Sequence, residues 1–402
     1  MTLFRSLTNR SFAFLWTGQT ISRLGDSLYR IALAWWVLEK TGSAAVMGTV
    51  LIFSFLPMLL FLLIGGVMVD RLPRGRVMLV SDILRGGIVA IVAALAFVQL
   101  LQVWHILIAS MIFGFVDAFF GPAYTAIVPE IISSENLPSA NSLTSLSRRV
   151  TGIVGPALGA TIVALGGTPT AFALDALSFF ISAACLVPIA RLWGERIAAA
   201  SANVFSDMRQ GFIAVFASPW LWITIVVFGF ANVMLEGSMG AALPFLVKNH
   251  LLADVGMLGL LESIASFGSI IAALWFGRRV RIRQRGLKTY GAAIVLSLAV
   301  LGLGLPIPLV GVMLAAFSFG LSESVIGLIW TNTLQELVPR DLLGRVASVD
   351  EFGSFVLIPI GYGVAGWATD SIGAPPVFVI SGGASLCLFV LALLHPAIRG
   401  LD

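Results

Sequence analysis

The chain has 402 residues, of which 58% are hydrophobic and 11% are charged. A soluble domain carries about 25% charged residues, so this composition excludes a soluble globular protein. The mean hydropathy of +1.01 points the same way. The formal net charge is +4. The basic residues collect in short loops, which is typical of membrane topology and requires no nucleic-acid partner.

Runs of about 20 apolar residues, each long enough to cross the hydrocarbon core of a bilayer, predict an all-α membrane protein. Twelve such spans are expected, at 12–38, 45–68, 77–100, 103–128, 140–166, 169–191, 219–246, 256–277, 288–305, 307–331, 345–370 and 375–396. They divide into a six-helix bundle at 1–191 and a second six-helix bundle at 217–402, joined by a cytoplasmic linker at 192–216.

An internal repeat relates the two halves. Residues 124–160 and 330–366 both read as an apolar helix, a short polar loop and a glycine-rich apolar helix. A shift of 206 residues pairs Tyr124 with Trp330, Glu130 with Glu336, Leu137 with Leu343, and Gly155 with Gly361. Membrane transporters are often built from such repeats, with the substrate site between them.

The distribution of Lys and Arg predicts the orientation. With the N-terminus in the cytoplasm, the cytoplasmic segments hold 17 basic residues, whereas the outer loops hold only Lys40 and Lys248. Positive residues favour the cytoplasmic side of a membrane. We therefore expect both termini and the linker to be cytoplasmic.

Charged residues inside the spans are the main functional candidates, because lipid does not tolerate them. Gln19, Arg23, Asp26 and Arg30 are spaced by 4, 3 and 4 residues and share one helix face. Asp26 is the first choice for a proton-responsive carboxylate, since a conformational change that separates it from an arginine can load or release a proton. The alternative is a permanent ion pair with Arg23 or Arg30 that holds the helix in place.

Further ionisable residues are expected within the membrane. The acids are Asp117, Asp175, Glu236, Glu262 and Glu323, and the arginines are Arg148 and Arg149. The candidates for a proton-coupling or substrate cavity are Gln19, Arg23, Asp26, Arg30, Asp117, Arg149, Glu236, Glu262 and Glu323. Their surplus of carboxylates suits a proton-coupled carrier. Asp82 and Arg85, three residues apart, are interpreted as a local ion pair.

The loop at 65–76 carries a recognisable motif. Gly66, Asp70, Arg71, Arg74 and Arg76 resemble the signature loop of the major facilitator superfamily, usually written G-x-L-A-D-R-x-G-R-K/R. The loop departs from that pattern, with proline at the usual glycine position and glycine before the last basic residue. The resemblance implies a latch that holds the two halves together on the cytoplasmic side when the transporter is open outward. The alternative is that the arginines only enforce topology.

The span at 140–166 contains a glycine face. Gly152, Gly155 and Gly159 lie on one side of the expected helix, and Pro156 favours a kink. The segment resembles the G-P-x-x-G core of the motif found in efflux-type antiporters of the superfamily, with Ala160 in place of the final glycine. Ordinary packing of small residues is the alternative reading.

The start of the chain resembles the enterobactin-exporter and macrolide-efflux branch of the superfamily, through Leu24-Gly25-Asp26, Trp35-Trp36 and Thr41-Gly42-Ser43. The resemblance implies the twelve-helix major facilitator fold with two pseudo-symmetric bundles, in a bacterial cytoplasmic membrane. It also implies proton-coupled export of an amphiphilic drug, macrolide or siderophore by a monomer. Uptake, lipid flipping and a non-transporting sensor remain alternatives. The sequence contains no enzyme or cofactor motif, so neither is expected. His105, His250 and His395 are scattered and lack metal-ligand spacing, so no metal site is expected.

Overall fold

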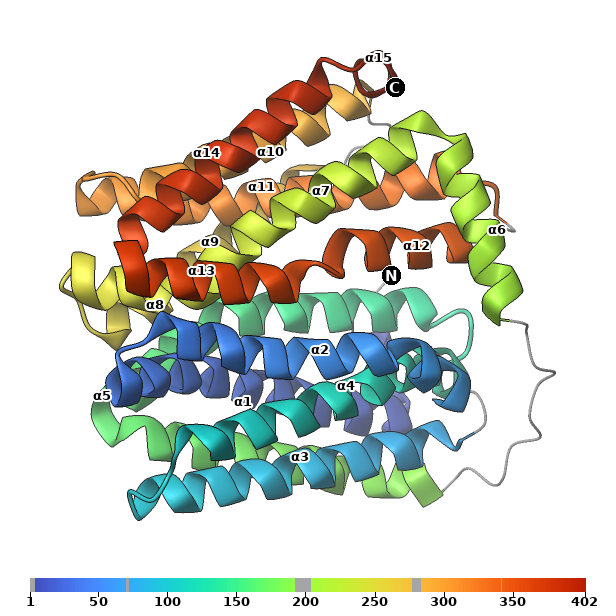
Figure 1. Cartoon of the computed structure of the whole chain (residues 1–402). Helices are drawn as coiled ribbons and strands as arrows, with labels where there is room; N and C mark the ends of the chain where they lie inside the picture. Colours follow the sequence, from blue (N-terminus) through green and yellow to red (C-terminus); the bar gives the residue numbers. More distant parts are fainter. Residues whose placement is uncertain (1–3, 70–71, 192–203, 277–282, 341) are drawn as a thin grey trace. The chain divides into compact units, whose positions relative to one another are not determined.

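In the computed structural model, the described part of the chain comprises residues 4–69, 72–191, 204–276, 283–340 and 342–402, and its regular structure is helical (Figure 1). Ten stretches of it are long and apolar enough to cross a membrane. With α1, which is 32 residues long but charged, and with α5 counted as two, these stretches account for the twelve predicted spans. The prediction of an all-α membrane protein is confirmed.

The first half of the chain forms five long helices. After a short 3-10 turn at Arg5–Thr8, they are α1 (Arg10–Thr41), α2 (Ala44–Val69), α3 (Arg74–Phe97), α4 (Val103–Ile131) and α5 (Leu137–Arg191). The last contains a break at Gly167, whose φ of 74° and ψ of 169° are non-helical. Glycine adopts a positive φ without strain. The break falls between the predicted spans 140–166 and 169–191, and not at Pro156, where the sequence favoured a kink.

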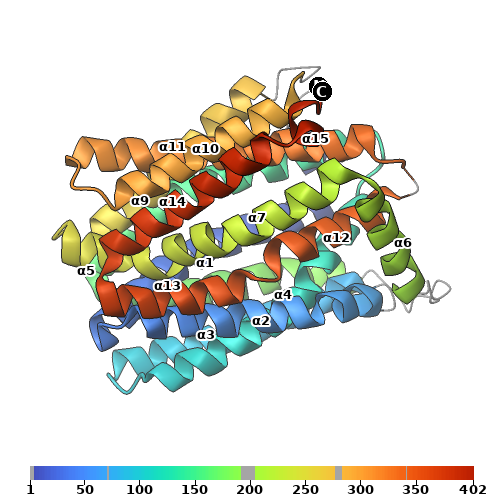
Figure 2. The ribbon, with the colours of Figure 1, turned by 45° about the horizontal axis from the view of Figure 1, so that its top comes forward.

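The second half contains more interruptions (Figure 2). Its elements are α6 (Val204–Ala217), α7 (Pro219–Gly237), η2 (Ser238–Ala242), α8 (Leu243–Phe245), η3 (Leu246–His250), α9 (Val255–Phe276), α10 (Arg285–Leu303), α11 (Leu309–Leu337), α12 (Leu343–Phe355), α13 (Ile358–Ile372), α14 (Ala374–Leu393) and α15 (Pro396–Arg399). The η2 and η3 turns are π-helical; η2 follows α7 directly, and η3 follows the short α8. Such turns are often found at functional sites.

The chain forms two compact units. The first comprises Met1–Gly42, Thr49–Ala200 and Ala253–Ser263, and the second comprises Ser43–Gly48, Ser201–Leu252 and Ile264–Asp402. The first turn of α2 thus belongs to the second unit, and the first turns of α9 belong to the first unit.

Asp370 of α13 holds the first turn of α2 within the second unit. Its carboxylate accepts hydrogen bonds from the Ser43 hydroxyl at 2.5 Å, from the Ala44 backbone N–H at 2.6 Å and from the Ala45 backbone N–H at 3.1 Å. These are orphan donors at a helix N-terminus, where a negative charge is stabilising. Asp370 therefore caps α2 from another helix.

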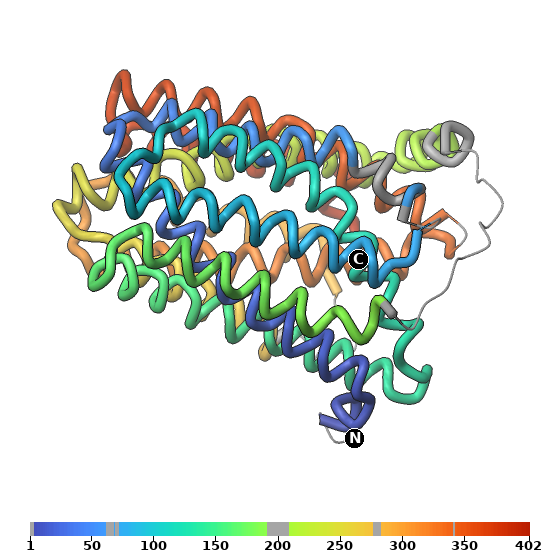
Figure 3. Tube along the Cα trace, turned by 90° about the horizontal axis from the view of Figure 1, so that it is seen from below, coloured from blue at the N-terminus to red at the C-terminus, as the bar shows by residue number. Residues whose placement is uncertain are grey.

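Small residues bring α1 and α5 together in the first unit. The later part of α5 runs beside α1 (Figure 3), where a Cβ added at Gly18 would lie 2.9 Å from the Cβ of Cys185. On the earlier part of α5, a Cβ at Gly155 would lie 2.5 Å from the Cβ of Ser27, and a Cβ at Gly159 would lie 3.1 Å from the Cα of Leu28. Helices in lipid associate through such close packing, because burial of apolar surface from lipid gives little driving force.

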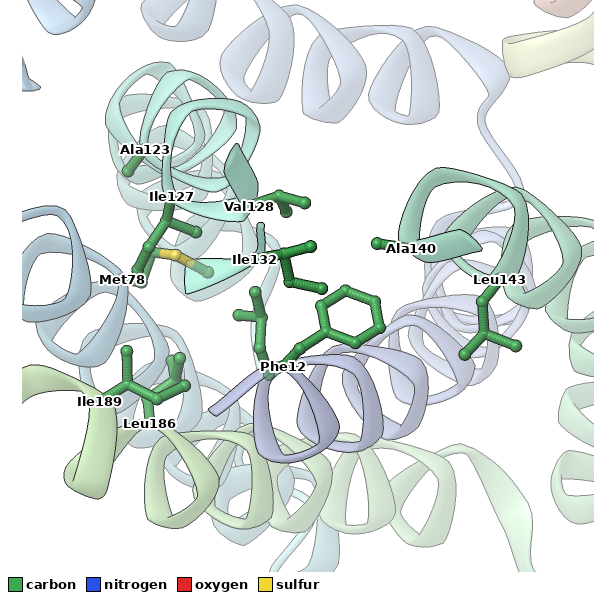
Figure 4. Close-up of a cluster of buried hydrophobic side chains, with 11 residues drawn as sticks. Phe12, Met78, Ala123, Ile127, Val128, Ile132, Ala140, Leu143, Leu186 and Ile189 are labelled. Atoms are coloured by element: carbon green, nitrogen blue, oxygen red, sulfur yellow. The ribbon is translucent and has the colours of Figure 1, made fainter. Parts of the chain in front are cut away.

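A buried core ties α1, α3, α4 and α5 to one another. Phe12, Met78, Ile127 and Leu143 come from these four helices, and none is more than 1% exposed (Figure 4). The four helices therefore form a fixed frame for the charged side chains that they carry further along.

The repeat is visible in the ion pairs of the two units. Arg74, the first residue of α3, pairs with Glu130 in the last turn of α4 at 2.5 Å. Arg285, the first residue of α10, pairs with Glu336 in the last turn of α11. Glu130 and Glu336 are paired by the shift of 206 residues, so both units close the same helix pair in the same way.

Other contacts repeat at the same shift. The Tyr124 hydroxyl lies 3.5 Å from the Thr144 hydroxyl in the first unit, and the Trp330 indole N–H donates to Asp350 at 2.7 Å in the second. The positions 124 and 330, and likewise 144 and 350, are paired by the shift. The repeat therefore extends from the sequence to side-chain contacts.

Candidate functional site

Each unit contains a cavity that is lined by several ionisable side chains. The cavity of the first unit has a volume of about 560 Å³. Its charged lining residues are Arg23, Asp26, Arg30, Arg85, Asp117 and Arg148. Four arginines thus face two aspartates, in a part of the chain where charge is costly unless it is paired or faces water.

Asp26 is half-buried on α1 and has no salt-bridge partner within 4.0 Å among the described residues. The two arginines expected to neutralise it have other contacts. Arg23 lies over the ring of Tyr124 at 5.1 Å, and Arg30 donates to the Ser27 hydroxyl at 3.4 Å. The strongest electrostatic attraction on Asp26 comes instead from Arg85 of α3. The ion pair within α1, which the sequence left open as an alternative, is not seen, and Arg85 of a neighbouring helix attracts Asp26 instead.

Arg85 is the centre of a buried network. It pairs with Asp82 at 2.6 Å and with Asp117 of α4 at 3.1 Å. Its guanidinium lies 4.1 Å from the ring centre of Phe120 and 4.8 Å from that of Phe179. The sequence predicted the pair with Asp82 but treated it as local. The structure shows that Arg85 also faces the cavity and joins α3 to α4.

Gln19 does not belong to the cavity, although it shares a helix face with Asp26. It is 3% exposed and donates hydrogen bonds to the Ser182 hydroxyl at 2.9 Å and to Asp82 at 3.4 Å. Asp175 is also fully buried, 3.3 Å from the Ser178 hydroxyl. Both residues serve the packing of α1 and α3 against α5.

Two further candidates lie in the first unit. The cavity is lined by Arg148 and not by Arg149, which is the neighbouring position named from the sequence. Glu262 lies in the segment of α9 that belongs to this unit, and Arg30 attracts it electrostatically. Arg30 therefore acts on two carboxylates from different helices, Asp26 and Glu262.

The cavity of the second unit is acidic. It has a volume of about 260 Å³, and three carboxylates line it: Glu236 of α7, Glu323 of α11 and Asp350 of α12. No lysine, arginine or histidine is among its described lining residues. Sequence reasoning named Glu236 and Glu323 but missed Asp350, which the shift of 206 residues would have connected to Thr144 in the first unit.

The three carboxylates differ in their partners. Asp350 accepts hydrogen bonds from the Trp330 indole at 2.7 Å and from the Ser354 hydroxyl at 3.4 Å. Glu236 and Glu323 have no hydrogen-bond or salt-bridge partner among the residues that the structure describes, and they repel each other electrostatically. Two unpaired acids therefore face the same space.

Aromatic side chains form much of the remaining wall. They are Phe228, Phe319, Trp330 and Phe355. Trp330 is fixed on two sides, by its hydrogen bond to Asp350 and by an edge-to-face contact with Trp220 at 5.8 Å between ring centres. The cavity thus combines negative charge with rigid aromatic surface.

The loop motif is only partly described. Asp70 and Arg71 lie outside the described residues, as do the surroundings of Gly66. Arg74 pairs with Glu130 and donates to the Ala126 carbonyl at 2.8 Å, whereas Arg76 is exposed. Arg74 therefore joins α3 to α4 in addition to any part in topology. The latch at Asp70 stays a prediction.

Known proteins resemble this chain along nearly its whole length. Macrolide efflux protein A of Streptococcus pyogenes is 25% identical over 400 residues, which cover 97% of each chain. The multidrug efflux pump Tap of Mycolicibacterium fortuitum is 28% identical over 393 residues, which cover 94% of each chain. The first resemblance agrees with the branch suggested by the start of the sequence.

Solved structures share the fold at lower identity. A bacterial homologue of the iron transporter ferroportin, in its inward-facing state, superimposes with a TM-score of 0.72 over 96% of this chain and 99% of its own, at 14% identity. A POT family transporter in complex with a thioalcohol-conjugated peptide superimposes with a TM-score of 0.75 over 96% of both chains, at 11% identity. A family model described as transmembrane secretion effector matches residues 1–399. The chain therefore belongs to this family of the major facilitator superfamily, whose members are multi-pass membrane transporters and not enzymes.

Proposed function

We propose that the protein is a proton-coupled exporter of amphiphilic organic molecules that works by alternating access in a bacterial cytoplasmic membrane. Membership of an efflux family and the names of the macrolide and multidrug relatives support export. The observation that carries proton coupling is Asp26, a carboxylate without a salt-bridge partner among the described residues, in a cavity beside the Arg85 network.

The network offers a simple exchange of partners. Arg85 now pairs with Asp82 and Asp117, while Asp26 is attracted to it from a greater distance. If a conformational change moves Arg85 toward Asp26, Asp117 loses its cation. A carboxylate that is separated from its cation in a poorly solvated site is favoured in its protonated form. One proton would then be taken up at Asp117 and released when Arg85 returns.

The test uses purified protein in vesicles with an imposed proton gradient and a macrolide as the first probe. Accumulation of the macrolide against its gradient should require the proton gradient. Asp26→Asn should abolish this accumulation but retain exchange of the probe down its own gradient. Glu135→Gln makes a matched control, because Glu135 is 79% exposed in a loop, and it should behave as the wild type.

Three results would contradict the proposal. Asp26→Asn with full proton-driven transport would remove Asp26 from coupling. Loss of exchange together with lowered thermal stability would assign Asp26 a structural role. Accumulation in the inward direction in intact cells would favour an uptake carrier.

The proposed orientation has its own test. Single cysteines at Lys40 and Lys248 should react with an impermeant thiol reagent added outside intact cells. A cysteine at Arg209, beyond the first turn of α6, should react only after the membrane is opened. Reaction of position 209 from outside would overturn the orientation.

A further inference from the structure

We propose that the acidic cavity of the second unit binds the cationic group of the transported molecule, a protonated amine or another organic ammonium on an apolar body. This inference rests on the proposed export function, which it deepens by naming a substrate class. Its basis is a cavity with three carboxylates, aromatic walls and no basic lining residue in the described part of the chain.

Arginines that line the first cavity have non-basic counterparts in the described lining of the second. At the shift of 206 residues, Asp117 of the first cavity corresponds to Glu323 of the second, so the acid is kept. Arg30 corresponds to Glu236, and Arg148 corresponds to Ser354. Two arginines that line the first cavity are thus replaced by an acid and a neutral residue that line the second.

The central arginine of the first unit is also replaced. Arg74 and Arg285 begin the equivalent helices α3 and α10, and Leu296 is as far from Arg285 as Arg85 is from Arg74. Leu296 lines the second cavity, as Arg85 lines the first. The second unit therefore keeps an acid in the cavity and has leucine in place of the internal cation that neutralises its counterpart in the first unit.

The unpaired carboxylates leave a place for an external cation. Glu236 is partly buried, lines the cavity and has no hydrogen-bond or salt-bridge partner among the described residues. Glu323 faces the same cavity and acts on Glu236 as a like charge. Uncompensated charge inside a membrane is costly, and a bound cation would attract both carboxylates.

The aromatic walls favour an organic cation over an inorganic one. An ammonium group is attracted to the face of an aromatic ring, and most strongly to tryptophan. Trp330 is held in place by Asp350 and Trp220, so its face is preformed. No group of three or more His, Cys, Asp or Glu with the geometry to hold a metal ion occurs among the described residues.

The size of the cavity limits how much of a ligand it can enclose. Its volume of about 260 Å³ is below the range of about 300–1,000 Å³ that is usual for sites enclosing a whole drug-sized ligand. The cavity therefore holds the amine-bearing part of a large amphiphile, and the rest of the molecule extends beyond it.

The experiment measures binding to purified full-length protein in lipid nanodiscs. The probes are tetraphenylphosphonium, a permanent cation, and triphenylphosphine oxide, a neutral molecule of similar shape. The wild type should bind the cation at least about tenfold more tightly than the neutral probe. Glu236→Gln and Glu323→Gln should each weaken binding of the cation by about tenfold or more and leave binding of the neutral probe unchanged.

Matched variants and readouts separate the outcomes. Glu135→Gln should change neither probe, and Glu236→Asp, which keeps the charge, should retain the preference for the cation. If the wild type binds both probes with equal affinity, the inference is wrong. This comparison needs no variant, so it holds even if a variant does not fold. Unchanged cation binding in both glutamine variants also overturns it. If the preference for the cation is present but transport needs no proton gradient, the inference stands and the proposed coupling fails.

Discussion

The two cavities come from equivalent parts of the repeat but carry opposite charge. Asp117 and Glu323 are paired by the shift of 206 residues and each faces its own cavity. In the first unit, arginines surround the acid and form a network through Arg85. In the second unit, the acids stand without a basic neighbour among the described lining residues. A repeated scaffold can thus supply one site suited to moving protons and another suited to holding a cation.

The difference also appears in the backbone. On the first side, α5 continues without interruption past Arg148 and Gly155 to Gly167. On the second side, α12 ends at Phe355 and α13 begins at Ile358, directly after the cavity residue Ser354. The wall of the second cavity therefore contains a helix break at a place where the helix of the first cavity is continuous.

Replacing Arg85 by the residue of its counterpart should have the largest effect. Arg85→Leu removes the partner of Asp82, which is fully buried, and of Asp117. Removal of one member of a buried ion pair destabilises a protein by about 3–5 kcal/mol. We expect low expression and a clearly lower Tm, with Arg85→Lys intermediate. A wild-type Tm for Arg85→Leu in nanodiscs would show that the network does not hold the first unit together.

Reversing the charge of the second cavity should have the next largest effect. Glu236→Arg introduces the residue type found at the paired position, Arg30. We expect at least about a hundredfold loss of tetraphenylphosphonium binding, or about 2.7 kcal/mol, and a gain in binding of the anion tetraphenylborate. Isothermal calorimetry measures both. Unchanged preference for the cation would mean that Glu236 is not part of the site.

The loop motif provides a smaller difference between the halves. The first half has Asp70, whereas the matching place at 276–279 has glycine and arginines but no acid. Asp70→Asn should insert normally but transport more slowly, because the latch loses about 1–2 kcal/mol of charge–dipole interaction. Initial rates at matched expression provide the measurement, and an unchanged rate argues against a gate at Asp70.

Asp370 should give the smallest effect. It caps the first turn of α2, and the shift of 206 residues pairs its position with Ala164 in the first half, which carries no acid. Asp370→Asn keeps a capping side chain but loses the charge, so a loss of about 0.3–1 kcal/mol is expected. Thermal unfolding should show a small drop in Tm, with a larger drop for Asp370→Ala. Equal Tm values for both variants would contradict the capping role.

The fold could be predicted from the sequence because the bilayer imposes strong rules. Apolar runs of fixed length gave the spans, and glycine at 167 marks a break that falls between two of them. The repeat was readable because Glu130 and Gly155 recur as Glu336 and Gly361 at one shift, and the structure places both glutamates in equivalent ion pairs.

The sites were harder to predict. Spacing along one helix shows which residues share a face, but it does not show which other helix or cavity that face meets. Gln19 and Asp26 share a face, yet α5 covers one of them and a cavity opens at the other. The spacing of Arg85 and Asp82 predicted an ion pair within one helix, and it gave no sign of the second ion pair that Arg85 forms with Asp117 on α4. Both outcomes depend on which helices are neighbours, which spacing along one helix does not contain.

We propose that the two cavities have different roles, with proton coupling in the first unit and cation binding in the second. The most direct test compares Asp26→Asn with Glu236→Gln in the same vesicles, measuring tetraphenylphosphonium affinity and proton-driven accumulation of the macrolide probe. We predict that Asp26→Asn keeps the wild-type affinity for the cation and loses proton-driven accumulation, whereas Glu236→Gln loses about tenfold or more of that affinity. If Asp26→Asn lost cation binding while Glu236→Gln kept it, the division of roles would be contradicted.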